Sequence, residues 1–226
     1  MAGTPARKTN WFAIWTSVAV VAVVAVVIGA VVWMNNSATA PGEAPQASNI
    51  DTETGAIVFG DGPDTVATYV DFMCPYCNQF EQTEGETIKG LVDDGSVTLE
   101  LHPVAILDRL SQGTEFSSRS AAAMYAVAAS DPDNAYAFMQ AMYENQPAES
   151  STGLTDEEII QIAKDAGVAV TDQLADDITS HKYVKFAQAQ QLPEGATGTP
   201  TLAVNGTLVP ITMNPQTDIV ANLTGQ

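Results

Sequence analysis

The only two cysteines of this chain lie two residues apart, in the stretch DFMCPYCNQF that runs from Asp71 to Phe80. Two cysteines at this spacing serve three chemistries: metal binding, haem attachment and a redox disulfide. Each chemistry requires other groups near the cysteines: a metal site needs further ligands, haem attachment needs a following histidine, and a redox disulfide needs a helix terminus that activates one thiol. The rest of the sequence therefore has to select among three arrangements.

An uncharged apolar segment occupies residues 11–34 near the N-terminus. As a helix it is long enough to cross a hydrocarbon core of about 30 Å. Trp11, Trp15 and Trp33 lie near its two ends, where tryptophan favours the membrane interface. The nearby basic residues precede the segment, so the positive-inside rule predicts a cytoplasmic stretch over 1–10 and an extracytoplasmic remainder. We therefore expect a single-pass cell-membrane protein.

A cleaved signal peptide is the alternative to this anchor. Ala38-Thr39-Ala40 has the small-residue pattern of a cleavage site. The apolar segment, however, is longer than the usual signal-peptide core of about 7–15 residues, and Pro41 would directly follow the cut. We expect an uncleaved anchor over 11–34.

The sequence changes character after the anchor. Residues 35–49 are small, polar and proline-bearing, which predicts a flexible linker. Residues 50–226 are numerous enough for one domain with its own core. All 27 acidic residues follow the anchor, against six basic residues there, for a charge of about −21. Nucleic-acid binding requires a basic surface and is therefore excluded.

Short β-branched and aromatic runs predict strands on both sides of the cysteine motif, over 56–59, 65–72 and 97–101. Between the last two, apolar residues recur at helical spacing from Phe80 to Val92, and Asp94-Gly95 ends this helix. The motif therefore lies where a strand turns into a helix.

Helical periodicity then extends over about 112–191. Thr155 followed by Glu158 predicts a capping box, and further helical pieces are expected near 171–180 and 182–191. This block carries no strand pattern. It therefore predicts an all-helical insertion in an α/β domain.

The C-terminal part returns to strands. Asn205-Gly206 between the apolar runs 201–204 and 207–209 is a strong hairpin signal. A short helix over 216–223 is expected to close the chain.

The helix that follows the motif gives the two cysteines different roles. Pro75 suits the first helical turn, which places Cys74 at the helix N-terminus. Free backbone N–H groups and the helix dipole stabilise a thiolate there, and the thiolate is the form that attacks disulfides. Cys77 lies one turn further along and can form a disulfide with Cys74.

The other two chemistries lack their ligands. Haem attachment needs a histidine after the second cysteine, and residue 78 is asparagine. A closed zinc site needs four ligands, and the two histidines, His102 and His181, have no motif spacing. We expect no metal and no cofactor, and we interpret His102 as a strand-end or core histidine. A purely structural disulfide is disfavoured because so short a loop constrains the unfolded chain little.

Two motifs in this order carry a resemblance to a known family. Cys74-Pro75-Tyr76-Cys77 (CPYC) at a strand-to-helix turn, with Gly198-Thr199-Pro200-Thr201 before a hairpin, resembles a DsbA-like thioredoxin-fold protein. The stretches DFMCPYCNQFE, LHPVAILDR and GTPTLAVNG resemble, more narrowly, the membrane-anchored DsbA-like proteins of actinobacterial envelopes. The resemblance covers roughly residues 50–226. It implies an α/β thioredoxin fold with an all-helical insertion, preceded here by a single transmembrane helix.

The resemblance also implies roles for individual residues. Pro200 should be cis and face the cysteines, so that a substrate peptide can pair with the backbone of Thr199. Many relatives carry a buried acid where this chain has Thr68, whereas Asp71 matches the narrower family. Without an acid at 68, Glu81 is a possible proton relay for Cys77 through water. A glutamate there is more often a solvated helix face, which we expect.

The sequence as a whole predicts an extracytoplasmic thiol–disulfide oxidoreductase that forms disulfides in exported proteins through Cys74 and Cys77. The resemblance implies a quinone-linked membrane enzyme of the DsbB or vitamin-K-epoxide-reductase-like type as reoxidant. Tyr76 stands where strong oxidants of the family have histidine, which predicts a milder oxidant. A reductase of the envelope, or a non-catalytic peptide-binding or redox-sensor module, remains open as an alternative.

Overall fold

The computed structural model describes residues 11–39 and 42–224 of the chain. It divides into two compact units, one up to Ala40 and one from Pro41 onward. The first unit contains one helix, and the second contains a five-stranded sheet with the helices that cover it. The predicted cytoplasmic stretch over 1–10 lies outside the described residues.

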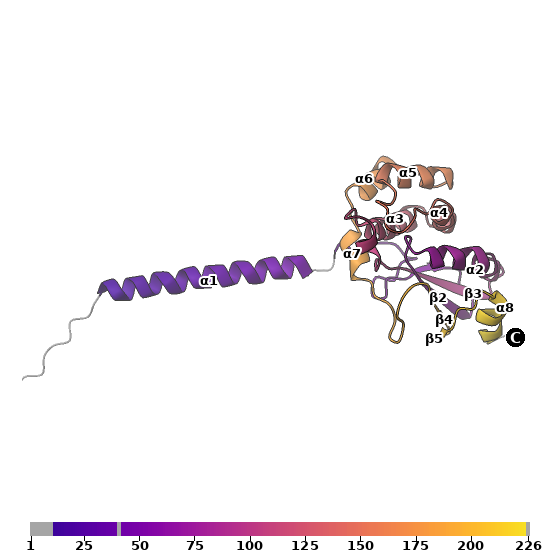
Figure 1. The fold of residues 1–226 in the computed structure, drawn as a ribbon, viewed down its shortest axis with the longest axis horizontal. Helices are drawn as coiled ribbons and strands as arrows, with labels where there is room; N and C mark the ends of the chain where they lie inside the picture. The colour runs from indigo at the N-terminus through magenta and orange to yellow at the C-terminus, as the bar shows by residue number, and fades with distance from the viewer. Residues whose placement is uncertain (1–10, 40–41, 225–226) are drawn as a thin grey trace, which may run out of the picture. The chain divides into compact units, whose positions relative to one another are not determined.

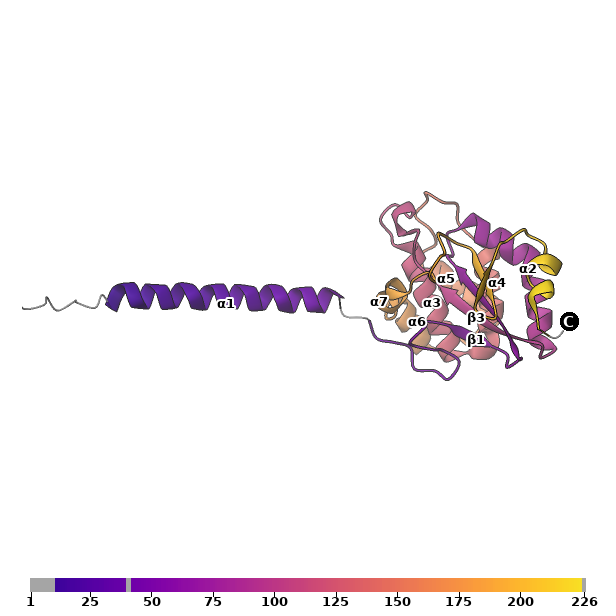
Figure 2. The ribbon, with the colours of Figure 1, turned by 90° about the horizontal axis from the view of Figure 1, so that it is seen from below.

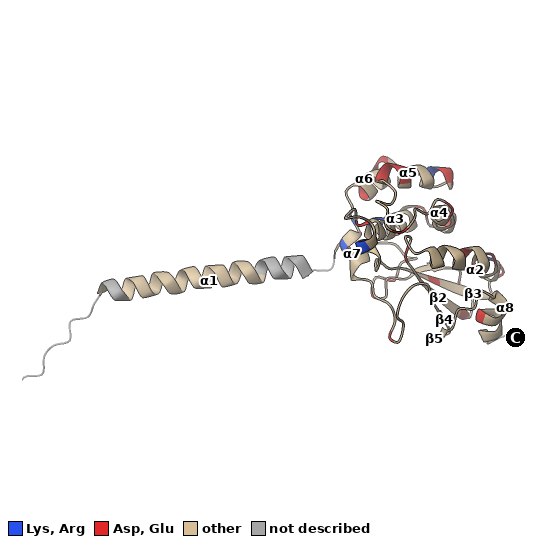
Figure 3. Cartoon of the chain, in the orientation of Figure 1, with Lys and Arg blue, Asp and Glu red and all other residues tan. Residues whose placement is uncertain are grey.

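The N-terminal unit is the single helix α1 (Trp11–Thr39). Its stretch Ile14–Val32 has a mean hydropathy of 2.6 and none of it is buried in the protein, so by length and composition it can cross a membrane. The coloured part of α1 in Figure 3 shows no charged residue, in contrast to the second unit. An apolar surface on every side of an isolated helix suits lipid rather than water.

The structure describes two parts of the predicted linker 35–49, residues 35–39 and residues 42–49. Residues 35–39 continue α1, because nothing in their sequence stops a helix. Residues 42–49 lie along the folded unit: Pro45 is buried, Ala44 packs on the core, and Asn49 Nδ2 donates to Ala128 O at 3.0 Å. Small apolar side chains can fill shallow surface grooves, a possibility that composition alone does not reveal.

The sheet has the strand order β1-β3-β2-β4-β5. β2 pairs parallel with β3, and the other neighbours pair antiparallel. β2 is central and its side chains are mostly buried, which agrees with its continuous β-branched composition. The strands are β1 (Ile57–Phe59), β2 (Asp64–Val70), β3 (Val97–Pro103), β4 (Thr201–Val204) and β5 (Thr207–Val209).

Helix α2 (Pro75–Asp93) connects the parallel strands β2 and β3 and begins inside the cysteine motif, directly after Cys74. A short 3-10 helix, Asp108–Leu110, follows β3. The helical insertion then comprises α3 (Phe116–Ser130), α4 (Pro132–Glu144), α5 (Asp156–Asp165), α6 (Asp172–Thr179) and α7 (Val184–Ala189). The insertion predicted over about 112–191 is therefore confirmed.

The insertion is stacked beside the sheet. In Figure 1, α5 and α6 form the outer layer, and α3 and α4 lie between them and the strands. Figure 2, the view from below, shows the strands in front of the insertion helices. Helix α3 is almost wholly buried, and its Tyr125 hydroxyl donates to Gly55 O at 2.7 Å. The capping box of Thr155 and Glu158 at the start of α5 is present as predicted.

The predicted C-terminal helix over 216–223 is wrong as a single element. The structure has one α-turn, α8 (Pro215–Asp218), followed by the 3-10 turn Val220–Asn222. The Asp218 carboxylate is fully buried and accepts hydrogen bonds from the Thr212 N–H and hydroxyl, each at 2.6 Å. Ile219 is also fully buried, so the two side chains hold a tight turn in place of a regular helix.

Candidate active site

Cys74 lies at the N-terminus of α2, as the sequence predicts. It is the N-cap residue, with extended backbone angles (φ −78°, ψ 115°), and Pro75 takes the first helical position. Proline is favoured there because the N–H it lacks would have no helical partner. The N–H of Cys74 donates to Asp71 O at 3.0 Å, which fixes the turn between β2 and the helix. The N–H groups of Tyr76 and Cys77 belong to the first turn of the helix, beside the sulfur, and the Cys77 N–H also donates to Cys74 O at 3.0 Å.

The Cys74 thiol is activated by its neighbours. A hydrogen bond from the Cys77 thiol is the largest cause, and with the Thr199 side chain and the N–H groups of Cys77 and Tyr76 it lowers the Cys74 pKa to about 6, against the effect of burial. The Cys74 Sγ also lies 3.3 Å from Thr199 O. A thiol with this pKa is largely ionised at neutral pH, which is what a nucleophile and a good leaving group require.

Cys77 has the opposite character. Its side chain is fully buried, and burial raises its pKa well above the ordinary value, as do the hydrogen bond to Cys74 and the negative charge there. Both cysteines are free thiols in the structure. The pair therefore combines one thiol with a lowered pKa and one with a raised pKa, and both side chains are buried.

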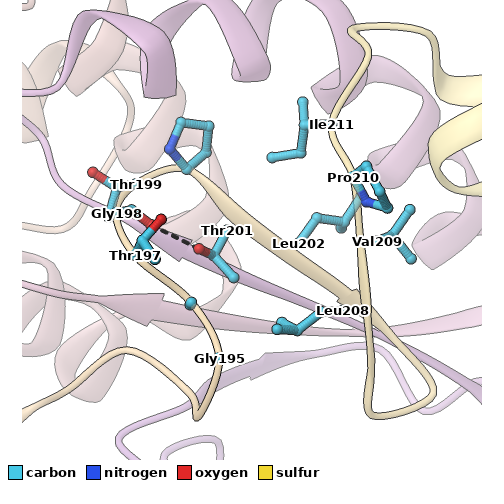
Figure 4. Close-up of a pocket in the computed structure, with 12 residues that line it drawn as sticks. Gly195, Thr197, Gly198, Thr199, Thr201, Leu202, Leu208, Val209, Pro210 and Ile211 are labelled. Carbon is cyan, nitrogen blue, oxygen red and sulfur yellow. Dashed lines mark hydrogen bonds between the residues drawn. The ribbon is translucent and has the colours of Figure 1, made fainter.

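The loop before β4 brings the second predicted motif against the first. The peptide bond between Thr199 and Pro200 is cis, and Thr201 Oγ1 donates to Gly198 O at 2.7 Å. Figure 4 shows this loop with the β4–β5 hairpin and Ile211 around an open groove of about 490 Å³. Tyr76 is 65% exposed. Thr199 lines this groove and its carbonyl oxygen also lies beside the Cys74 thiol, so an extended peptide paired with the Thr199 backbone would lie close to Cys74.

Two polar residues that the sequence analysis missed hold the start of α2. Gln146, just past α4, donates from Nε2 to Phe72 O (3.0 Å) and Cys74 O (2.9 Å). Asn78 donates from Nδ2 to Tyr143 O (2.9 Å) and to Gln146 Oε1 (3.2 Å). Asn78 stands in the motif, yet only its partners across the fold show its use. Nothing in the sequence spacing could identify Gln146.

Asp71 is fully buried between the cysteines and the insertion. Its Oδ1 accepts from the Met73 N–H (2.9 Å) and the Ser117 hydroxyl (2.7 Å), and its Oδ2 accepts from the N–H groups of Ile106 and Leu107 (both 3.0 Å). Burial nevertheless raises the Asp71 pKa, against the effect of these bonds. The carboxyl group ties the motif, the loop after β3 and helix α3 together.

Glu81 is not the solvated helix face that we expected. Its side chain is only partly exposed, and its Oε1 lies 3.4 Å from both the Tyr136 hydroxyl and the Gln140 amide. Burial raises its pKa above the usual value. Glu81 also lines, with Thr68 and Cys77, a small cavity inside the domain. The structure therefore brings the residue named as a possible proton relay to the side of Cys77.

The two histidines are engaged elsewhere. His102 is buried in β3, stacks on the Tyr69 ring at 4.1 Å between centroids, and is 3.2 Å from Thr54 O through Nδ1. This confirms its interpretation as a core histidine. His181 Nε2 lies 2.8 Å from an Asp156 carboxylate oxygen. Within residues 11–39 and 42–224, no cluster of three or more His, Cys, Asp or Glu residues could hold a metal ion.

These features, a buried thiol pair at a helix N-terminus opposite a cis-proline loop, agree with the match of residues 53–220 to the family model described as thioredoxin. The chain belongs to the thioredoxin family. Within it, the chain resembles DsbG of Mycobacterium tuberculosis in its reduced form, at 32% identity and a TM-score of 0.66, covering 84% of this chain and 92% of that one. Oxidised DsbA of Mycobacterium tuberculosis also shares 32% identity, with a TM-score of 0.62, covering 70% of this chain and 86% of that one. The predicted DsbA-like fold is confirmed.

More distant matches add the fold alone. MdbA of Actinomyces oris, a thiol-disulfide oxidoreductase, shares 24% identity with a TM-score of 0.63, over 81% of this chain and 91% of that one. Among curated proteins the chain matches the serine/threonine-protein kinase PknE of Mycobacterium tuberculosis, at 29% identity over 113 residues. That match spans 48% of this chain but only 20% of the kinase. This member of the thioredoxin family therefore has the fold of the DsbA-like thiol–disulfide oxidoreductases.

Proposed function

We propose that this thioredoxin-family protein is a membrane-anchored oxidase that forms disulfides in exported proteins. The observation that carries the proposal is the asymmetry of the two thiols. Cys74 has a pKa of about 6, whereas burial raises that of Cys77 well above its ordinary value. An oxidase needs a first thiol that is released easily and a second thiol that is shielded.

The reaction starts from the Cys74–Cys77 disulfide. A substrate thiolate attacks the Cys74 sulfur, the disulfide breaks, and Cys77 leaves as a thiolate that takes up a proton. A second substrate thiolate then attacks the substrate sulfur of the mixed disulfide. Cys74 is released as a thiolate, which its neighbours stabilise. Two electrons have moved from the substrate to the cysteine pair, and the substrate leaves with a disulfide.

The surrounding residues would position the substrate. Pro75 and Tyr76 cover the helix start, and the Thr199 backbone beside the cis bond to Pro200 faces the groove. An extended peptide can pair with that backbone as an added strand. The partners are therefore exported proteins or peptides that present thiols in extended segments.

Reoxidation requires an acceptor for two electrons and two protons. The cysteine pair has no such acceptor of its own, so we propose a quinone-linked membrane enzyme of the DsbB or vitamin-K-epoxide-reductase-like type. The apolar helix α1 would hold both proteins in one membrane. It would also leave the second unit outside the cytoplasm, because the basic residues near α1 precede it.

The direction of electron flow can be tested with the full-length protein in detergent micelles. The oxidised protein, mixed with reduced and unfolded ribonuclease A without glutathione, should form one substrate disulfide for each Cys74–Cys77 pair consumed. The reduced protein should reduce insulin disulfides more slowly than thioredoxin does. Fast insulin reduction with no ribonuclease oxidation would support a reductase, and inactivity in both assays would support a binding or sensor module.

Topology needs a separate experiment. A reporter enzyme that works only outside the cytoplasm, fused after Gln226, should be active, and the full-length chain should stay in washed membranes. A soluble form that begins near Pro41 would show cleavage and remove the anchor from the proposal.

A further inference from the structure

The segment that follows β5 forms one wall of the groove that the proposed function assigns to the substrate. Its residues Val209, Pro210 and Ile211 line the groove, and Figure 4 shows them across it from Gly198 and Thr199. β5 ends at Val209, and residues 210–214 belong to no helix or strand. The hydrogen bonds of the sheet therefore do not fix this wall, and other contacts must hold it.

A buried carboxylate holds the segment just beyond the wall. Asp218 accepts from the Thr212 N–H and hydroxyl, each at 2.6 Å, and from the Asn214 N–H at 3.3 Å. Between these two residues, Met213 has a φ of 61°, a left-handed backbone that residues with a side chain rarely adopt. Burial acts to raise the Asp218 pKa, yet these bonds hold it below its ordinary value. Asp218 thus anchors, as an anion, a turn that begins directly after Ile211.

Glu84, on α2, is the acidic neighbour of Asp218. Its side chain is fully buried, and neither carboxyl oxygen has a hydrogen-bond partner among the described residues. The adjacent Thr83 touches the same turn, with its hydroxyl 3.5 Å from the Met213 sulfur. Burial raises the Glu84 pKa to about 7, and the nearby Asp218 carboxylate contributes. A second buried negative charge here would be uncompensated, so Glu84 carries a proton below about pH 7.

The proton gives this pair the donor that it otherwise lacks. Two ionised carboxylates only accept hydrogen bonds and repel each other, whereas a protonated one can donate to its neighbour. We propose that Glu84 and Asp218 share one proton as a latch that holds Thr212 on α2, and that the two acids thereby position the Pro210-Ile211 wall of the substrate groove. The inference rests on the proposed function and deepens it. It makes substrate binding depend on a proton outside the cysteine pair.

The latch depends on this one proton because no other charge acts on it. Helix α2 packs against β3, α4 and α8. Asp218 of α8 contributes to the pKa of Glu84, and no other described side chain does. The titratable groups without such an effect include Glu100 and His102 of β3 and Asp133, Tyr136, Tyr143 and Glu144 of α4. On α2 itself, Lys89 is paired with Asp93.

The sign of the pH dependence follows from the two states of Glu84. With the turn in place, its pKa is about 7, and with the turn released into water it returns to the ordinary 4.5. The proton therefore stabilises the latched state fully below about pH 4.5, and this contribution is lost as the pH rises to 7. Between pH 6 and pH 8, the ratio of released to latched protein should increase about tenfold.

Hydrogen exchange measures the latch without any substrate. Exchange of the amides of residues 211–214 is followed by mass spectrometry at pH 6 and pH 8, with the full-length protein in detergent micelles. Glu84→Gln is compared at each pH, so that the intrinsic exchange rate cancels. Its amide can donate to Asp218 at both pH values. Relative to this variant, the wild type should lose about tenfold of its protection between pH 6 and pH 8.

Oxidation of reduced ribonuclease A measures the effect on the groove. At pH 8 the KM of the wild type should exceed that of Glu84→Gln about twofold to fivefold, because fewer molecules have the wall in place. The two kcat values should agree within about twofold, and the two KM values should agree at pH 6. Comparison at equal pH cancels the ionisation of the substrate thiols.

Matched variants separate the proton from the structure. Thr212→Val removes one donor to Asp218 and should raise exchange and KM by the same factor at both pH values. Glu86→Gln, at an exposed position of α2, should match the wild type. Formation of a mixed disulfide with oxidised glutathione should stay within about twofold in Glu84→Gln, because it depends on the Cys74 thiolate and not on the wall.

Two results would overturn the inference. An equal pH dependence of exchange in the wild type and Glu84→Gln would show that no shared proton holds the turn. Equal KM values at pH 8, despite unequal exchange, would show that the wall does not serve the substrate. Either result leaves oxidation of ribonuclease by the wild type intact. Failure of the wild type to oxidise ribonuclease at both pH values would instead refute the proposed function, whatever the exchange shows.

Discussion

The surroundings of Cys74 and Cys77 are built in different ways, although the two residues are one helical turn apart. Cys74 is controlled by groups close to it in the chain, the N–H groups of Tyr76 and Cys77 and the Cys77 thiol, with Thr199 added from one loop. Cys77 is controlled by burial among side chains from two strands and two helices. The pKa of Cys74 therefore depends mainly on a local motif, and that of Cys77 depends on the whole domain.

The sharpest way to break this comparison is to remove each thiol in turn. Cys74→Ser should abolish substrate oxidation and the fast alkylation seen below pH 7, a loss of at least about a thousandfold, because the remaining thiol is buried and protonated. Cys77→Ser should keep the fast thiol and accumulate mixed disulfides with the substrate. Alkylation kinetics and non-reducing gels measure both. A faster alkylation of Cys77 in the Cys74→Ser variant than of Cys74 in the Cys77→Ser variant would reverse the assigned roles.

A substitution of Asp71 should disturb the surroundings of Cys74 and of Cys77 at the same time. Asp71→Asn leaves one carbonyl oxygen for four donors and turns an NH₂ group toward two of them, so it should cost about 2–3 kcal/mol of stability. It should also slow both thiol steps, because the turn before Cys74 and the loop after β3 lose their common anchor. Thermal unfolding by circular dichroism measures the stability.

Ser117→Ala is the graded comparison for this experiment, since it removes one of the four donors and should cost about 1 kcal/mol. Asp94→Asn, at the exposed end of α2, is the control and should change little. A fully stable Asp71→Asn protein would show that the carboxyl group is not the anchor described above.

Glu84 tests whether burial on α2 can raise a pKa and change stability without any effect on the cysteines. It is fully buried, and neither carboxyl oxygen has a hydrogen-bond partner among the residues that the structure describes. Burial, together with the nearby Asp218 carboxylate, raises its pKa to about 7. Between about pH 4.5 and 7 the folded protein keeps a proton on Glu84 that the unfolded chain has lost. The contribution of Glu84 to the free energy of unfolding is therefore complete below about pH 4.5 and decreases as the pH rises towards 7.

Glu84→Gln should remove this decrease. At pH 8 the variant should be more stable than the wild type by about 1 kcal/mol, a rise of ~2–4 °C in Tm, and its stability should vary less between pH 5 and 8. Thermal unfolding at the two pH values measures this, with the exposed Glu86→Gln as control. Resolution by Cys77 should not change, because Glu84 is not among the residues that line its cavity. An unaltered pH slope would contradict the account.

The smallest expected effect comes from Tyr76→His on the Cys74 side. A histidine there adds a donor or a positive charge beside the thiolate, so the Cys74 pKa should decrease and the reduction potential should increase. The side chain at 76 is 65% exposed, and solvent should limit the pKa change to less than about one unit. The wild-type potential should lie between about −270 and −120 mV. Glutathione titration and thiolate absorbance measure the two quantities, which should change together; a change in neither would refute the explanation.

Much of this protein can be predicted from local sequence, because local rules control the parts concerned. The strand-to-helix turn follows from β-branched residues and Pro75, the hairpin from Asn205-Gly206, and the reactive thiol from its place at a helix N-terminus. The resemblance to DsbA-like proteins added the cis bond before Pro200. Each of these needs only a few neighbouring residues.

The errors occur where distant residues compete with local preference. The C-terminal helix ends early because Asp218 and Ile219 are drawn into the core. Within the predicted linker, Ala44 and Ala47 pack against the core of the domain. Glu81 has the pattern of an exposed helical glutamate, and only the approach of α4 makes it a buried neighbour of Cys77.

The sequence by itself determined which thiol lies at the helix N-terminus, because a helix N-terminus and a proline are properties of adjacent residues. Only the tertiary structure decided what surrounds the second thiol. Gln146, Tyr143 and Asp71 meet around the motif through contacts that span 46 to 74 positions in the chain. Hydrogen bonding and burial depend on distance in space, and no spacing in the sequence encodes that distance.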